Sequence, residues 1–159
     1  MSIIPTLQWR FLIAVLNSTV SLWIARSTFT SKQGGFFEFT QQFVSQLPIP
    51  KADKWQTASV DILIDAIAAG GSAIVRLESL LNAFVYELFF PEELASRGLS
   101  PFAAAREAGL DKLAGLEGGA LARAADLWSV QIADPSTKLY ATLFDLQSID
   151  EIRIIEGRG

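Results

Sequence analysis

A chain of 159 residues, half of them hydrophobic and with a mean hydropathy of +0.33, has ample material for the core of one domain. It contains no Cys and no His, which excludes disulfides, thiolate nucleophiles, Ser-His-Asp triads and the usual zinc sites. The net charge of −4 has the wrong sign for a protein that wraps nucleic acid unaided.

The first predicted helix begins at Pro5 and Thr6, with Thr6 as its N-cap, and runs through residues 7–25. Its apolar face recurs at helical spacing: Phe11, Leu12, Val15, Leu16, Thr19 and Trp23. Polar residues interrupt the stretch, so it lacks the unbroken run of about 20 apolar residues that a membrane span needs, and it has no convincing signal-peptide cleavage site. We therefore interpret it as a buried amphipathic helix and expect a cytoplasmic protein without membrane contact, which the absence of Cys also fits.

Residues 28–35 predict a loop, and the aromatic content of residues 36–39 predicts a short strand. Thr40 can then cap one or two helical turns. The prolines within residues 47–50 end that helix, because a proline nitrogen donates no hydrogen bond, and this segment is expected to be extended, as in an edge strand.

A second helix is predicted to start at Thr57 or Ser59, with an apolar stripe of Val60, Leu63, Ile64 and Ile67. The Gly pair at 70–71 interrupts it, and a third helix follows over residues 74–88. One kinked helix or two helices in a hairpin would both fit this pattern, and the Gly pair favours the hairpin.

The rest of the chain predicts short helices over residues 101–109, from 115 or 119 to 128, and over 139–146, with a loop at 132–138 and a tail at 152–155 that fits a strand or a helix end. The expected fold class is mainly α with a small β element (α+β). A helical hairpin or bundle would pack beside the short Phe-rich strand.

Two blocks of this sequence together resemble one known family. The first contains Leu16-Asn17-Ser18, Lys32-Gln33-Gly34-Gly35-Phe36-Phe37-Glu38-Phe39, Gln42-Phe43 and Leu47-Pro48-Ile49-Pro50, and the second is Leu80-Leu81-Asn82-Ala83-Phe84-Val85-Tyr86-Glu87-Leu88-Phe89. In order and spacing they resemble the TaqI-like C-terminal specificity domain, and the helix after it, of adenine-N6 DNA methyltransferases and type IIG restriction-modification enzymes. The resemblance covers residues 7–92 and can be extended to the closing Ile154-Ile155-Glu156.

This resemblance implies that residues 1–52 are the C-terminal part of a target-recognition domain and that residues 53–159 are a helical spacer or docking region, although one compact domain would also fit. In the family, a separate N-terminal domain methylates DNA with S-adenosylmethionine and an Asn-Pro-Pro-Tyr type motif. This chain has neither that motif nor a Gly-rich cofactor loop after a strand. We therefore expect no catalytic residue, metal or cofactor here, with S-adenosylmethionine implied only for a parent methyltransferase or restriction endonuclease.

The best candidates for DNA contact are one arginine and the loop that follows its helix: Arg26, Ser31, Lys32, Gln33, Gly34 and Gly35. Glycines let the backbone approach a phosphate, while the polar side chains supply charge and hydrogen bonds. Alternatively, the Gly pair only permits a tight turn, and Arg26 only complements the C-terminus of its helix. The family commonly has Arg or Lys before the Gly pair and Tyr after it, where this chain has Gln33 and Phe36. The loss of the cation at position 33 removes one expected charge-assisted phosphate contact.

Other polar and aromatic residues are expected to be structural. The acidic pairs Asp61/Asp65 and Glu92/Glu93 lack a His or a third ligand, so we expect solvated faces there. Tyr86 is expected at a helix–helix contact. Core positions are expected for the large aromatic residues Trp9, Trp23, Phe36, Phe37, Phe39, Trp55 and Trp128.

Two functions from different classes are compatible with these features. The first is a non-catalytic DNA target-recognition fragment, which would bind DNA together with its parent enzyme. The second is a helical protein-interaction or assembly module, favoured by the acidic pI of about 4.8 and the apolar helix faces, which would dock on the parent methyltransferase domain or associate with a second copy.

Overall fold

The computed structural model describes residues 9–28 and 45–158. This part of the chain is mainly helical, as predicted, and contains no strand. The extended segment at 47–50 pairs with no strand among the described residues, whereas the predicted Phe-rich strand at 36–39 lies outside them.

The first predicted helix is two helices, so the prediction of a continuous helix was wrong. α1 (Trp9–Leu16) and α2 (Thr19–Thr28) are bent by 59° at the break between them. Ser18 Oγ accepts the Ser21 N–H at 3.2 Å, and both serine hydroxyls donate to the Val15 carbonyl at 2.6 Å. The two hydroxyls therefore supply hydrogen-bond partners to backbone groups at the end of α1 and the start of α2. These partners stabilise a break inside an apolar run.

The hairpin predicted from the Gly pair is confirmed. α4 (Lys54–Ala68) begins one turn earlier than predicted, because Asp53 and Gln56 form a reciprocal capping box. Gly70 and Gly71 have φ values of +85° and +100°, which reverse the chain into α5 (Ile74–Phe89).

The turn between α4 and α5 is held from outside the hairpin. Asp126 Oδ1 accepts the Ala73 N–H at 3.0 Å. The φ value of Gly71 requires glycine at this position, and a Cβ atom there would also lie 2.8 Å from that same oxygen, so Asp126 would have to shift.

The remaining helices and turns complete the fold: α6 (Pro91–Ser96), α7 (Pro101–Glu107), the 3₁₀ turn η2 (Leu110–Leu113), α8 (Gly118–Ala133), α9 (Lys138–Asp145), the 3₁₀ turn η3 (Leu146–Ser148) and α10 (Asp150–Ile155). Prolines occupy the first position of α6 and α7, where the missing N–H costs nothing. α8 runs five residues beyond its predicted end at 128, and the ambiguous tail at 152–155 is helical.

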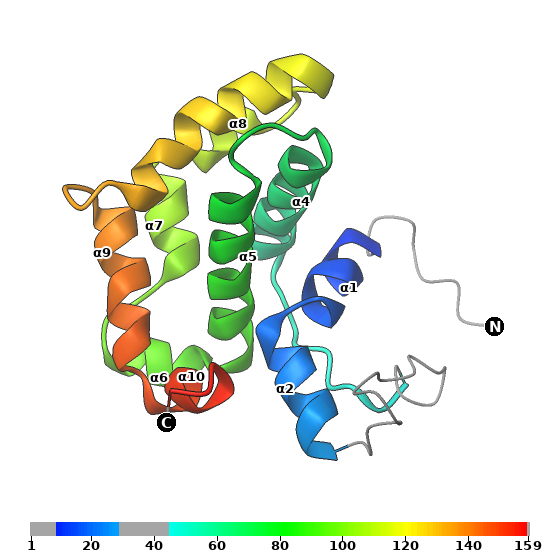
Figure 1. Cartoon of the computed structure of the whole chain (residues 1–159), viewed down its shortest axis with the longest axis vertical. Helices are drawn as coiled ribbons and strands as arrows, with labels where there is room; N and C mark the ends of the chain where they lie inside the picture. The colour runs from blue at the N-terminus through cyan, green and yellow to red at the C-terminus, as the bar shows by residue number, and fades with distance from the viewer. Residues whose placement is uncertain (1–8, 29–44, 159) are drawn as a thin grey trace.

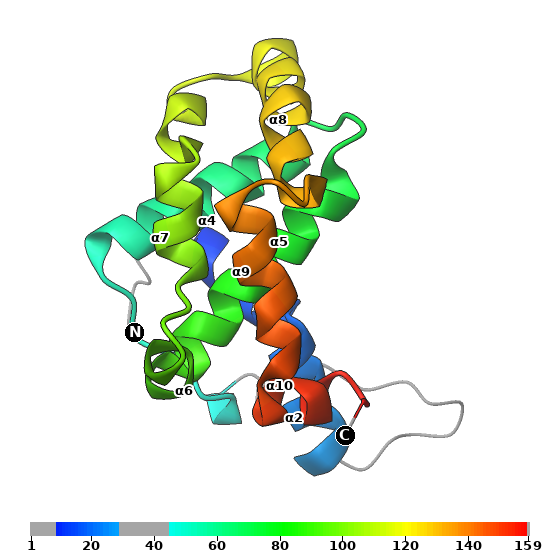
Figure 2. The same cartoon turned by 90° about the vertical axis from the view of Figure 1, so that its left-hand side faces the viewer.

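α5 lies at the centre of the molecule (Figure 1). α4, α1 and α2 flank one side of it and α7 and α9 the other, while α8 crosses one end and α6 and α10 lie at the opposite end (Figures 1 and 2). The main core surrounds Leu63, Leu77, Phe84 and Phe102, and a second core joins Val20 and Tyr86 to Leu94, Leu146, Ile149 and Ile152. α5 contributes to both cores, so it fixes the relative positions of the other helices.

The tryptophans divide between core and surface. Trp128 is buried and donates from Nε1 to the Ala108 carbonyl at 2.9 Å, and Trp55 is half-buried against Phe102. Trp9 and Trp23 are 43% and 39% exposed, so their predicted core positions were wrong. Both lie outside the buried faces of their helices, which consist of Phe11, Ala14 and Val15 on α1 and of Val20, Ser21 and Ala25 on α2.

Within the described ranges, no single helix is long and apolar enough to cross a membrane. α1 and α2 together reach the required length and composition, but only as the bent pair.

Candidate functional site

Of the six residues predicted to contact DNA, Arg26 is the one within the described residues. It is exposed in the last turn of α2, and no carboxylate of the described part of the chain pairs with it. Ser31, Lys32, Gln33, Gly34 and Gly35 lie outside the described residues. Among the described residues, no partner occupies the Arg26 guanidinium, and Arg26 complements the negative end of the α2 dipole.

The two sequence blocks on which the predicted family resemblance rests meet at the start of α2. The Thr19 N–H donates to Asn82 Oδ1 at 3.0 Å, although the two residues are 63 positions apart. The first N–H groups of a helix have no partner within the helix, so a side chain from α5 completes the N-terminus of α2. The position of α2 therefore depends on Asn82.

The closing segment of the chain meets α5 one turn beyond Asn82. The Tyr86 hydroxyl donates to Glu156 Oε1 at 3.0 Å, and Tyr86 is 3% exposed. Burial, followed by the negative charge of Glu156, raises the pKa of the Tyr86 hydroxyl. Tyr86 therefore remains a hydrogen-bond donor at a helix–helix contact, where the sequence predicted it.

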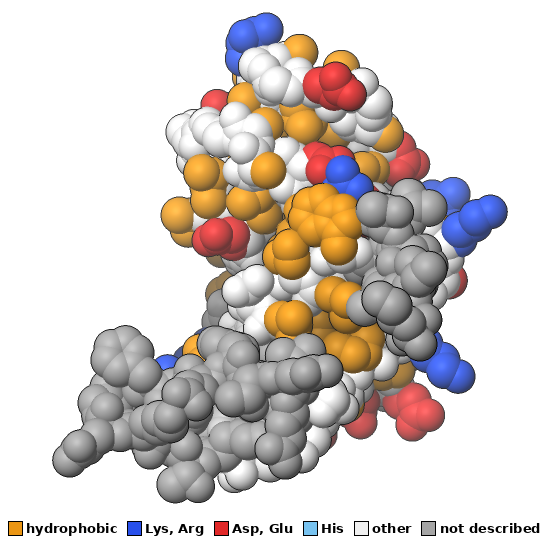
Figure 3. All heavy atoms as spheres, turned by 90° about the vertical axis from the view of Figure 1, so that its right-hand side faces the viewer, with side chains coloured by type: hydrophobic (Ala, Val, Ile, Leu, Met, Phe, Trp, Pro, Cys, Tyr) orange, Lys and Arg blue, Asp and Glu red, His pale blue; other side chains and the backbone are white. Residues whose placement is uncertain are grey.

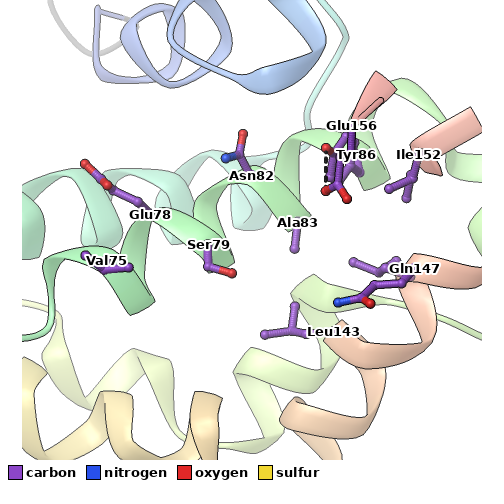
Figure 4. A pocket seen from close by; sticks show the side chains of 11 residues that line it. Val75, Glu78, Ser79, Asn82, Ala83, Tyr86, Leu143, Gln147, Ile152 and Glu156 are labelled. Carbon is purple, nitrogen blue, oxygen red and sulfur yellow. Dashed lines mark hydrogen bonds between the residues drawn. The ribbon is translucent and has the colours of Figure 1, made fainter. Parts of the chain in front are cut away.

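A groove of about 340 Å³ follows the outer face of α5 between these contacts and α9 (Figure 4). Val75, Glu78, Ser79 and Asn82 of α5 line it, and Leu143 and Gln147 face them. The Tyr86–Glu156 pair lies at one end. Glu156 is also paired with Arg158, so the phenol and the carboxylate both already have partners.

A second groove of about 440 Å³ lies on the other side of α5, where α1 and α4 form its walls. Its lining is more apolar and includes Ile13, Ile64, Ile67 and Leu81 beside the polar side chains of Asn17 and Glu78. Glu78 and Asn82 line both grooves, so α5 forms a ridge between them. In the described ranges, no group of three or more acidic residues is placed to hold a metal ion.

The prediction that Asp61 and Asp65 form a solvated face is confirmed only in part, because the Asp65 side chain is 47% exposed whereas one carboxylate oxygen of Asp61 is buried. Asp65 Oδ1 pairs with Arg10 Nε of α1 at 2.8 Å, and Arg10 also lies over the Trp9 ring. Asp61 Oδ1 is buried, and no group of the described residues donates to it. Both carboxylates face α1. The one feature of the sequence that could have indicated this contact is Arg10, which is 55 residues away from Asp65. Glu92 and Glu93 lie in the first turn of α6, where Glu92 is exposed.

Burial raises the pKa of Asp61, Arg10 opposes that increase, and Asp65 adds to it. A carboxyl whose pKa is higher in the folded state contributes stability below its unfolded pKa, and this contribution is lost as pH rises through the folded pKa. We therefore expect Asp61→Asn to raise the urea midpoint at pH 7 and to make no difference at strongly acidic pH. Exposed Glu92→Gln is the control, and an equal response of both variants would contradict this account.

Asn82→Ala is expected to lower the free energy of unfolding by about 1–2 kcal/mol, because the Thr19 N–H loses its acceptor in a partly buried place. The matched control is Asn17→Ala, whose exposed side chain bonds only to the Ile13 carbonyl within α1. Urea denaturation of both variants provides the measurement. An equal loss from the two substitutions would show that Asn82 does not support α2 in this way.

Comparison with known proteins adds no relative to this description. No protein-family model, no curated protein and no solved structure matches the chain.

Proposed function

We propose that this chain is a non-catalytic target-recognition part of an adenine-N6 DNA methyltransferase or restriction-modification enzyme, and that a separate domain supplies the chemistry with S-adenosylmethionine. The observation that carries the proposal is the resemblance between its sequence blocks and the TaqI-like specificity domain. The contacts Thr19–Asn82 and Tyr86–Glu156 support it, because residues within or directly beside those blocks meet in space.

The described side chains are consistent with a role in positioning the enzyme on DNA. Tyr86, Glu156 and Asn82 are each engaged in hydrogen bonds between helices. The bond from Thr19 to Asn82 fixes the start of α2, whose last turn presents Arg26 toward solvent shortly before residues 29–35. A phosphate contact at this place would orient the enzyme on DNA, while base recognition would come from elsewhere.

Affinity for DNA would come mainly from the complete enzyme. The chain has a net charge of −4, and phosphate binding needs several cations that displace counterions. Arg10 is occupied by Asp65, so within the described part of α1 and α2 only Arg26 offers a free guanidinium.

The test uses the complete enzyme that carries this chain. Arg26→Ala and Lys32→Ala should each weaken binding to its DNA site and lower the slope of log affinity against log salt by about one, since each removes one phosphate contact. Arg123→Ala is the matched control, because Arg123 is an exposed arginine on α8. The proposal fails if the enzyme without residues 7–92 still methylates its own sequence specifically.

A helical protein-interaction module is the second candidate function. The observation that favours it is the exposure of large apolar residues on α1 and α2, among them Trp9, Ile13, Leu22 and Trp23. Such residues on a surface commonly mark a protein contact.

A further inference from the structure

The outer side of α8 carries a regularly spaced stripe of residues. α8 crosses one end of the molecule (Figures 1 and 2), and its buried residues pack into the main core from the other side of the helix. We call the outer set the α8 stripe; its members are Ala120, Arg123, Leu127, Val130 and Asp134, the last of which caps the C-terminus of the helix. They follow one another at alternating spacings of three and four residues, the pattern with which one helix packs along another.

The middle of the α8 stripe is apolar. Leu127 and Val130 are 78% and 55% exposed. The outer side of a helix in a globular protein is ordinarily polar, because its apolar residues face the core. Two large apolar side chains directly opposite the buried side therefore indicate a contact with another molecule.

We propose that the α8 stripe is the interface with a second copy of this chain, in which the two α8 helices pair antiparallel about a two-fold axis. This inference does not depend on the proposed function.

The positions of the charges in the α8 stripe select a second copy in this orientation. Arg123 comes four residues before Leu127, and Asp134 comes four residues after Val130. In an antiparallel pair with Leu127 opposite Val130 of the second copy, Arg123 therefore lies opposite Asp134 of the second copy, and the two-fold axis repeats both contacts. A parallel pair would instead set each of these charges against itself, and antiparallel helices also align their dipoles favourably.

Both charges are available for this contact. Arg123 is exposed, and no carboxylate of the described part of the chain pairs with it. Asp134 Oδ1 accepts the N–H of Ser136 at 2.9 Å and its hydroxyl at 2.8 Å, and these bonds lower the pKa of Asp134, so it stays ionised at neutral pH. Asp126, beside the stripe, already accepts the Ala73 N–H and would lie near Gln131 of the second copy, not near another carboxylate.

A second surface with exposed apolar residues lacks this complementarity. Hydrophobic side chains are visible in the middle of the side of the molecule on which α1 and α2 lie (Figure 3). α1 and α2 contain no acidic residue, so a two-fold pair through these helices would offer Arg26 no carboxylate from either of them. Leu22, which is 39% exposed on α2, therefore provides the matched control for Leu127.

The experiment is sedimentation velocity of the full chain over micromolar to submillimolar concentrations, because an interface of one helix from each copy is small and its dimer correspondingly weak. Leu127→Ala should weaken dimerisation by about 10-fold or more, since a two-fold dimer loses the side chain twice. Leu22→Ala should leave the dimer constant unchanged. Circular dichroism establishes that each variant is folded, which is expected because both leucines lie at the surface.

Charge reversal tests the orientation of the two helices. Removing one exposed charge has a small effect, so the variants are Arg123→Asp and Asp134→Arg, each of which sets like charges against each other in its own dimer. Each should weaken self-association by about 10-fold. An equimolar mixture of the two should recover the dimer, because every pair in the mixed dimer then joins opposite charges.

Three results overturn the proposal. The first is a chain that is monomeric at every concentration. The second is a dimer that Leu22→Ala weakens and Leu127→Ala does not. The third is a pair of charge-reversed variants that dimerise as well as the wild type, or whose mixture associates no better than either variant alone.

Discussion

Replacing Phe102 with alanine is expected to lower the free energy of unfolding by about 3–5 kcal/mol, the range measured for fully buried aromatic residues. Phe102 is 1% exposed at the start of α7. Its ring stacks on Phe84 of α5, with 4.1 Å between the centroids and 14° between the planes, and Trp55 of α4 packs edge-on at 5.9 Å. Three helices lose a shared contact in this variant, and urea denaturation measures the loss.

Phe144→Ala is the matched control, because Phe144 is 57% exposed on α9. We expect it to change the free energy of unfolding by less than about 1 kcal/mol. Similar losses from the two substitutions would mean that the Phe84–Phe102 stack is not a centre of the core.

The second large effect is expected at Glu87, whose carboxylate holds the start of α7. Oε1 accepts the Ser100 hydroxyl at 2.7 Å, and Oε2 accepts the Phe102 N–H at 2.9 Å. Glu87→Ala leaves both donors without this partner, and we expect a loss of about 2 kcal/mol at neutral pH. Exposed Glu92→Ala, on the surface of α6, should have little effect in the same thermal or urea measurement.

Glu87 should also make stability depend on pH. Burial raises the pKa of its carboxyl, and the hydrogen bonds from Phe102 and Ser100 partly oppose that increase. Because the folded pKa is higher than the unfolded one, this contribution to stability is complete below the unfolded pKa and is lost as pH rises through the folded pKa. Glu87→Gln should flatten the stability profile in that window. A profile as steep as that of the wild type would contradict the assignment.

The sequence predicted the features that depend on local chemistry. The Gly pair at 70–71 predicted the hairpin, and the apolar spacing of residues 74–88 predicted α5. The capping box of Asp53 and Gln56 is equally local, and the pattern of an N-cap acceptor followed three residues later by Gln would have placed the start of α4 correctly.

The break between α1 and α2 was harder to predict. The apolar periodicity continues through it, and only the polar cluster around Ser18 indicates that side chains could replace the backbone partners. A serine can bond to the backbone inside a continuous helix, or it can end the helix. Which of the two occurs depends on how the helical segments before and after the serine pack. Trp9 and Trp23 both lie outside the buried faces of their helices, so a single apolar face drawn through residues 7–25 placed Trp23 wrongly.

The contacts at the candidate site join distant residues. Thr19 meets Asn82, and Tyr86 meets Glu156, which is 70 residues away from it. The predicted resemblance groups these segments of the sequence, but no spacing rule predicts which of their side chains bond to each other. Arg26 lies where the sequence placed it, at the end of the first helical region, and its predicted contact with DNA stays a prediction.

The bond between Thr19 and Asn82 has a consequence for the order of folding. α2 has only 10 residues, too few for a stable helix in isolation, and an acceptor for its first turn comes from a helix 63 residues away. α2 should therefore consolidate only after the hairpin of α4 and α5 has formed. Asn82→Ala should then accelerate unfolding and leave the folding rate nearly unchanged.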